Sequence, residues 1–127
     1  MYVIGLTGGI GSGKSTVAQM LEGKGAALLS ADAVGHEVYL LDQPAWREVV
    51  EAFGQRIVAQ DGAIDRKKLG AIVFSDPEQL RRLNAITHPR MKEMMREKLE
   101  EERTRGARVA VLEAALLFDA GWDDLTD

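Results

Sequence analysis

The stretch that decides the fold is Gly8-Gly9-Ile10-Gly11-Ser12-Gly13-Lys14-Ser15. It matches the phosphate-loop pattern G-x-x-x-x-G-K-[ST] at every fixed position. Glycines let the main chain turn tightly and point successive N–H groups at one anion, and a following helix adds the positive end of its dipole. In such a loop Lys14 reaches the β and γ phosphates, Ser15 offers its hydroxyl to Mg²⁺, and Thr16 reaches a phosphate nearer the nucleoside.

The alternative interpretation of this stretch is a glycine-rich surface turn with an ordinary lysine. In a chain of this length the pattern arises by chance roughly once in a few hundred cases. The required context is also present, because a short apolar run precedes the loop at residues 2–6 and a helical pattern follows at residues 14–21. The sequence therefore favours a nucleotide-binding phosphate loop.

Three short apolar runs predict the strands of a buried sheet. They lie at residues 2–6, 26–30 and 108–112, and they are continuous rather than alternating, as in parallel strands. Three strands are few for a doubly wound sheet. We therefore predict an α/β class protein with a three-layer P-loop NTPase fold and a parallel sheet that is incomplete at the C-terminus.

Between the second and third strands the sequence predicts only helices. We expect them at residues 32–41, 44–53, 65–74, 77–86 and 89–105, the last beginning at Pro89. A proline fits the first turn of a helix, where its missing N–H has no intrahelical partner to lose.

The composition excludes several classes of protein. The net charge of −4 does not favour nucleic acid as a partner. The absence of cysteine excludes disulfides, thiolate metal sites and a cysteine nucleophile. We see no signal peptide and no run of apolar residues long enough to cross a bilayer, so we expect no membrane partner and a cytoplasmic location. We further expect a monomer or a weak homo-oligomer.

Two carboxylates follow predicted strands. Asp32 comes just after the second strand, where it can accept a proton from an attacking hydroxyl or act as the N-cap of the next helix. Glu113 ends the third strand, where it can hold Mg²⁺ through a water or serve only as a polar strand end. Both alternatives stay open for each residue.

Among the basic and histidine side chains, the sequence alone favours structural roles. We interpret His88 as a structural hydrogen-bonding residue and His36 as a helix-surface residue. Arg66, Lys67 and Lys68 form a small basic cluster, which is either a solvated face or a contact for an anionic substrate.

Five segments, in order along the chain, resemble the dephospho-CoA kinases. They are residues 4–15, Ala31-Asp32, residues 62–75, His88-Pro89 and residues 113–118. Because the similarity runs through the whole chain, it is far more specific than the phosphate loop alone.

The resemblance implies an ATP- and Mg²⁺-dependent phosphorylation of the 3′-hydroxyl of dephospho-CoA, which gives coenzyme A. It implies one truncated P-loop kinase domain over residues 1–127, with a helical CoA-substrate-binding region within residues 33–105. Lys14 and Asp32 are the implied catalytic residues, and Ser15 and Glu113 the implied metal ligands. Substrate contacts are implied for Asp32, Arg66 and His88. The implied ATP-binding residues are Gly9, Gly11, Ser12, Gly13, Lys14, Ser15 and Thr16.

Two other functions fit the phosphate loop. One is a GTP-binding switch module, although the chain contains no Asn-Lys-x-Asp guanine-recognition segment. The other is an inactive fragment of a P-loop NTPase whose sheet edge is completed by another chain.

Overall fold

The computed structural model describes residues 1–8, 13–40 and 42–127. These residues form two compact units, which we call the sheet unit (Met1–Val34 with Lys92–Asp127) and the helical unit (Gly35–Met91). The prediction of a single kinase domain over residues 1–127 stays a prediction. The helical unit lies within the segment, residues 33–105, in which a helical region was expected.

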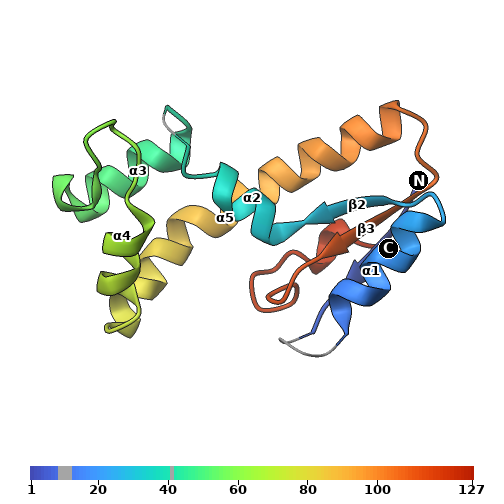
Figure 1. Cartoon of the computed structure of the whole chain (residues 1–127), viewed down its shortest axis with the longest axis horizontal. Helices are drawn as coiled ribbons and strands as arrows, with labels where there is room; N and C mark the ends of the chain where they lie inside the picture. The colour runs from blue at the N-terminus through green and yellow to red at the C-terminus, as the bar shows by residue number, and fades with distance from the viewer. Residues whose placement is uncertain (9–12, 41) are drawn as a thin grey trace. The chain divides into compact units, whose positions relative to one another are not determined.

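The sheet unit is built on three parallel strands. They are β1 (Tyr2–Leu6), β2 (Ala27–Ser30) and β3 (Val109–Glu113), in the order β1-β3-β2. The strands β1 and β2, which follow one another along the chain, therefore pair with β3 and not with each other. Figure 1 shows β2 and β3 side by side, pointing in the same direction.

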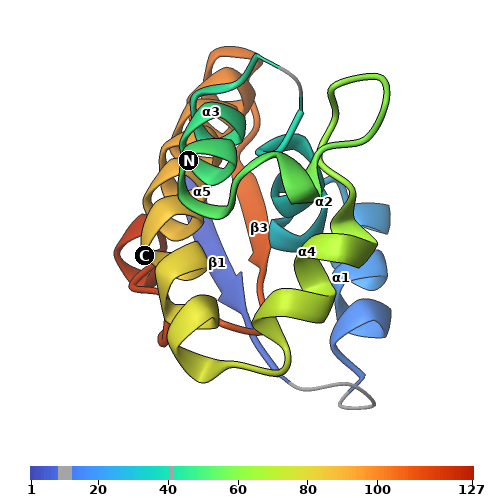
Figure 2. The same cartoon turned by 90° about the vertical axis from the view of Figure 1, so that its left-hand side faces the viewer.

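Helices lie on both faces of this sheet. Helix α1 (Lys14–Gly23) lies on one face, and the part of α5 (Pro77–Thr104) that belongs to the sheet unit lies on the other (Figure 2). Val111 and Leu112 of β3 are fully buried, as is Met95 of α5. The short 3₁₀ helix η2 (Asp123–Leu125) lies near the end of the chain. The predicted α/β class with a parallel sheet is thus confirmed.

The helical unit has its own apolar core. It contains α3 (Pro44–Phe53), the short 3₁₀ helix η1 (Gln55–Ile57), α4 (Arg66–Val73) and the first part of α5. Seven buried side chains form the core: Val49, Phe53, Ile57, Ile64, Leu69, Val73 and Leu83. At the edge of this core the indole N–H of Trp46 donates to the carbonyl of Gly62 at 2.9 Å, which ties α3 to the turn before α4.

Two predicted helix boundaries are wrong. The helices expected at residues 77–86 and 89–105 are one helix, α5, with Pro89 inside it. A proline removes one intrahelical hydrogen bond, but Leu83 before it and Met95 after it are both buried. Packing of these apolar positions stabilises a helix more than one missing bond destabilises it. The helix expected at residues 32–41 is shorter: α2 spans Ala31–Glu37.

No helix in the described part of the chain is both long enough and apolar enough to cross a lipid bilayer.

Gly5 in β1 allows the end of the chain to lie close to the sheet. A Cβ atom at Gly5 would lie 2.8 Å from Cδ2 of Leu117 and 2.9 Å from Cγ2 of Thr126. The carbonyl of Val3, also in β1, accepts a hydrogen bond from the N–H of Asp127 at 2.9 Å. The close approach of residues 126–127 to β1 therefore depends on the missing side chain.

We expect Gly5→Ala to lower the free energy of unfolding by about 1–3 kcal/mol, because overpacking displaces neighbouring side chains. Chemical denaturation followed by circular dichroism measures this change. Gly23→Ala is the matched control, because nothing lies within 4 Å of a Cβ atom built at that helix-end position. Equal stability of the two variants would show that β1 has room for a methyl group.

Candidate active site

The carboxyl ends of the three strands meet at one edge of the sheet. Glu113, the last residue of β3, is in register with Leu6 at the end of β1 and with Ser30 at the end of β2. The phosphate-loop sequence follows β1 and Asp32 follows β2, so the three predicted parts of the site lie at the same edge. In open α/β sheets this edge is where ligands bind.

Two hydrogen bonds hold the chain that follows β1 next to the chain that follows β3. The N–H of Ala114 donates to the carbonyl of Leu6 at 3.0 Å. The hydroxyl of Thr7 donates to the carbonyl of Ala115 at 3.3 Å. The chain that leaves β1 is thereby held beside the chain that leaves β3, and Glu113 lies immediately before this contact.

Helix α1 begins as a phosphate-binding helix requires. Gly13 is its N-cap, with a left-handed φ of 82° that favours glycine, and its carbonyl accepts from the N–H of Val17 at 3.1 Å. Among the described residues, no side chain caps this helix end and no acidic residue lies in its first turn. The N–H groups of that turn therefore stay available for an anion.

Several predicted ATP-binding residues lie outside the described part of the chain. Gly9, Gly11 and Ser12 belong to the undescribed segment 9–12. Lys14 and Ser15 are the first two residues of α1, but their side chains also lie outside the description, so their predicted contacts stay predictions. Thr16 is exposed on the first turn of α1.

Asp32 is an exposed carboxylate that the helix does not use as its cap. It is the second residue of α2, and the hydroxyl of Ser30 accepts the N–H of Ala33 at 3.4 Å. The cap of this helix is therefore Ser30. Within the described residues, Asp32 makes no hydrogen bond or ion pair, which leaves both its oxygens available to a ligand.

Glu113 stands at the position that a metal-binding carboxylate requires. It is partly buried at the end of β3. The described residues contain no cluster of three side chains able to hold a metal ion by themselves. Mg²⁺ in nucleotide sites commonly has only one or two protein ligands, with phosphates and waters completing the octahedron. The prediction that Glu113 is one such ligand stays a prediction.

In the helical unit, Arg66 begins α4 and Asp65 caps it. The carboxylate of Asp65 accepts the N–H groups of Lys67 at 3.0 Å and of Lys68 at 3.2 Å. The Arg66 guanidinium extends to the ring of His36, with Nη1 lying 3.0 Å from Nε2. The sequence pattern indicated only a surface role for His36.

His88 and its neighbour Thr87 lie on the first part of α5. Burial lowers the pKa of His88, so its ring tends to be neutral near pH 7. The side chain of buried Thr87 hydrogen-bonds to Tyr39, whose pKa is raised by burial and lowered in part by that bond and by the charge of Arg66. Thr87 thus contacts Tyr39 directly, whereas Arg66 acts on it through its charge.

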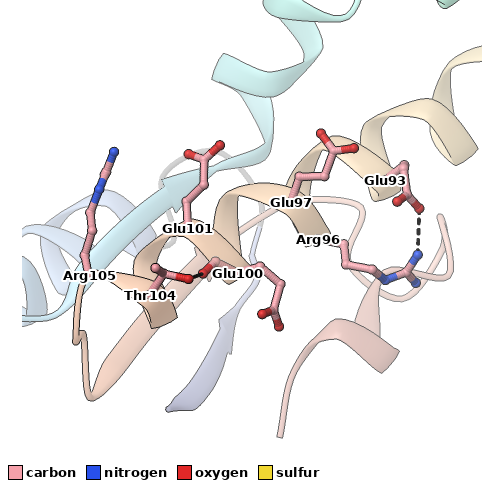
Figure 3. A pocket seen from close by; sticks show the side chains of 7 residues that line it. All are labelled: Glu93, Arg96, Glu97, Glu100, Glu101, Thr104 and Arg105. Atoms are coloured by element: carbon pink, nitrogen blue, oxygen red, sulfur yellow. Dashed lines mark hydrogen bonds and ion pairs between the residues drawn. The ribbon is translucent and has the colours of Figure 1, made fainter.

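One surface hollow has no part in this site. It lies along α5 of the sheet unit, and Figure 3 shows the ion pair between Glu93 and Arg96 on one side of it, at 2.7 Å. All of its lining residues belong to one helix face: Glu93, Arg96, Glu97, Glu100, Glu101, Thr104 and Arg105. Because charges of both signs alternate along it, this is a solvent-exposed charged face.

Comparisons with known proteins agree with this geometry. The sequence profile of the dephospho-CoA kinase family matches residues 2–127. A dephospho-CoA kinase from Moorella thermoacetica is 47% identical over 128 residues, covering 100% of this chain and 60% of the relative. One from Geobacter sulfurreducens is 49% identical over 127 residues, covering 100% of this chain and 64% of the relative.

Solved structures show the same fold. The protein TT1252 from Thermus thermophilus superposes with a TM-score of 0.78 at 37% identity, over 98% of this chain and 61% of that one. A dephospho-CoA kinase from Campylobacter jejuni superposes with a TM-score of 0.74 at 25% identity, over 98% of this chain and 63% of that one. The chain thus spans about three-fifths of these relatives, and it belongs to the dephospho-CoA kinase family.

Proposed function

We propose that this protein transfers the γ-phosphoryl group of ATP to the 3′-hydroxyl of dephospho-CoA, giving coenzyme A and ADP. The observation that carries the proposal is the family match over residues 2–127. It is supported by the register that puts Glu113 level with Leu6, before the phosphate-loop sequence, and with Ser30, before Asp32. The proteins from Moorella thermoacetica, Geobacter sulfurreducens and Campylobacter jejuni are named dephospho-CoA kinases, and this similarity does not favour a GTP-dependent switch.

The phosphate loop binds the triphosphate in this proposal. Main-chain N–H groups of the loop and of the first turn of α1 surround the phosphates, and the Lys14 ammonium neutralises the β and γ groups. The residues assigned to ATP are Gly9, Gly11, Ser12, Gly13, Lys14, Ser15 and Thr16. Because phosphoryl transfer needs little covalent help from the protein, most of the catalysis comes from this positioning and charge neutralisation.

A magnesium ion completes the nucleotide site. Ser15, through its hydroxyl, and Glu113, through its carboxylate or an intervening water, would hold it. When bound, Mg²⁺ neutralises charge on the β and γ phosphate oxygens. The position of Glu113 in register with Leu6 and Ser30 supports this assignment, because the loop starts one residue beyond the end of β1.

Asp32 is the proposed general base. Its carboxylate accepts the proton of the 3′-hydroxyl as that oxygen forms its bond to the γ-phosphorus. At the same time the bond between the γ-phosphorus and the bridging oxygen breaks, and ADP leaves. The exposure of Asp32 and the use of Ser30 as the helix cap support this role, since the carboxylate is not occupied by the backbone.

The helical unit is proposed to bind the rest of the substrate, with Arg66 and His88 as contact residues. An exposed guanidinium suits the anionic groups of dephospho-CoA. A neutral, partly buried imidazole suits a hydrogen bond to an uncharged group of the substrate.

The proposal is tested by adding ATP, Mg²⁺ and dephospho-CoA to the protein at its natural length and following coenzyme A by chromatography. We expect coenzyme A in proportion to ADP. A parallel reaction with GTP and a nucleotide-release assay separate a kinase from a GTP switch. Tight GTP binding without coenzyme A would reject the kinase assignment.

A further inference from the structure

His36 and Arg66 form an unusual side-chain pair in the helical unit. His36 is the next-to-last residue of α2, and Arg66 is the first residue of α4. Nη1 of Arg66 lies 3.0 Å from Nε2 of His36 and also contacts Nδ1. Two side chains that are both able to carry positive charge therefore meet, although they are 30 positions apart in the chain.

Among the ion pairs described for this chain, none joins His36 or Arg66 to a carboxylate. By contrast, four of the five arginines of α5 make such ion pairs. Two acids adjoin the pair in the sequence. Asp65 has its Oδ1 atom bound to the backbone N–H groups of Lys67 and Lys68, and Glu37, next to His36, also takes part in an interaction.

The pair also has more hydrogen-bond donors than acceptors. A guanidinium has five N–H donors and no acceptor, and a neutral imidazole has one donor and one acceptor. A ring nitrogen of His36 can accept one hydrogen bond from Arg66. The other N–H groups of Arg66 and the N–H of His36 then find no acceptor within the pair. A phosphate group supplies several acceptor oxygens and a negative charge, and arginine binds it in a bidentate manner.

Tyr39 and Thr87 are bonded to each other in the same unit, and the charge of Arg66 acts on Tyr39. Thr87 is 2% exposed, and its side chain hydrogen-bonds to Tyr39. Tyr39 is partly buried and close enough to Arg66 to interact electrostatically with it. The Arg66 guanidinium thus contacts His36 directly and acts on Tyr39 through its charge.

From this geometry we propose that His36 and Arg66 together bind the diphosphate group of dephospho-CoA. The inference rests on the proposed function and deepens it, because it adds His36 to the substrate site and states which chemical group the pair receives. His36 donates one N–H to a phosphate oxygen, and Arg66 donates two.

The test measures binding and turnover in the protein at its natural length. His36→Ala and Arg66→Ala should each raise the Kd for dephospho-CoA, measured by calorimetry without ATP, by about tenfold, the usual loss for one charge-assisted hydrogen bond. The Kd for ATP should not change. Arg81→Ala is the matched control, because Arg81 is an exposed arginine of the helical unit that pairs with Glu78.

A third variant tests whether His36 itself binds the phosphate or only orients Arg66. His36→Arg keeps a donor for phosphate but removes the ring nitrogen that accepts from Arg66, so it should retain a Kd within about threefold of wild type. If His36 serves only to orient Arg66, His36→Arg should be as poor as His36→Ala. That result, or a wild-type Kd in the folded His36→Ala variant, would overturn the inference.

Failure of the inference is distinguishable from failure of the proposed function. A wild-type protein that forms coenzyme A while His36→Ala binds dephospho-CoA normally rejects only the role of His36. A wild-type protein that binds dephospho-CoA through this pair without forming coenzyme A rejects only the kinase function. Absence of dephospho-CoA binding by the wild type rejects the inference itself.

Discussion

Replacing Lys14 with alanine should lower kcat for coenzyme A formation by about a thousandfold or more, the scale on which phosphoryl transfer depends on a positive group at the transferred phosphate. Lys14 is the first residue of α1, directly after the left-handed Gly13. In the proposed function its ammonium group neutralises the β and γ phosphates, where negative charge shifts as the bond to the leaving group breaks. Steady-state assays with saturating ATP and dephospho-CoA measure the effect.

Lys24→Ala is the control for this variant. Lys24 is the C-cap of the same helix, so the two substitutions remove the same side chain from opposite ends of α1. We expect wild-type kcat for Lys24→Ala and unchanged thermal unfolding for both variants. If Lys14→Ala keeps more than about a tenth of the wild-type kcat, the ammonium group does not stabilise the transferring phosphate and the proposed loop function is wrong.

Local chemistry was enough to predict most of the fold. The helix at Pro44–Phe53 has the predicted bounds because Pro44 fits the first turn and Gly54 follows it with φ of 84°. The three strands were recognised from continuous apolar runs. Their order was not, because β3 lies between strands that are adjacent in sequence, and pairing depends on contacts between distant residues.

Proline 89 shows why a local rule fails. The rule that a proline begins or ends a helix describes an isolated segment. In α5 the helix continues because apolar positions on both sides of the proline, such as Leu83 and Met95, are buried. A sequence pattern does not state how much each half gains from packing, so one long helix and two short ones could not be distinguished.

The candidate site was predictable where one motif defines it and not where distant residues meet. Asp32 and Glu113 were found because each follows a predicted strand. From sequence, Asp32 could be either a proton acceptor or the N-cap of α2. In the structure the N-cap of α2 is Ser30. The contact of His36 with Arg66 joins two helix ends, and the only local signal was a lone histidine on a polar helix face. Such a residue usually lies in water, so sequence alone favoured the simpler interpretation.

Replacing Asp32 with asparagine should lower kcat by about a hundredfold or more, since a positioned general base contributes roughly 10²–10⁴ to rate. Asparagine keeps the shape of the side chain but cannot accept the proton of the 3′-hydroxyl. Because Asp32 makes no hydrogen bond with the described residues, the substitution should leave the fold and the Kd for ATP unchanged. Rapid-quench measurement of a single turnover isolates the transfer step from product release.

Asp42→Asn provides the comparison for Asp32→Asn. Asp42 is an exposed aspartate outside the proposed site, and its φ of 69° is one that asparagine also tolerates. Its single-turnover rate should equal that of wild type. Asp32→Asn could instead raise the Kd for ATP about tenfold and lower the transfer rate by the same factor. The carboxylate would then help to bind ATP and its metal ion and would not act as a base. The two outcomes separate proton transfer from ligand binding, because a base is needed only when the hydroxyl attacks.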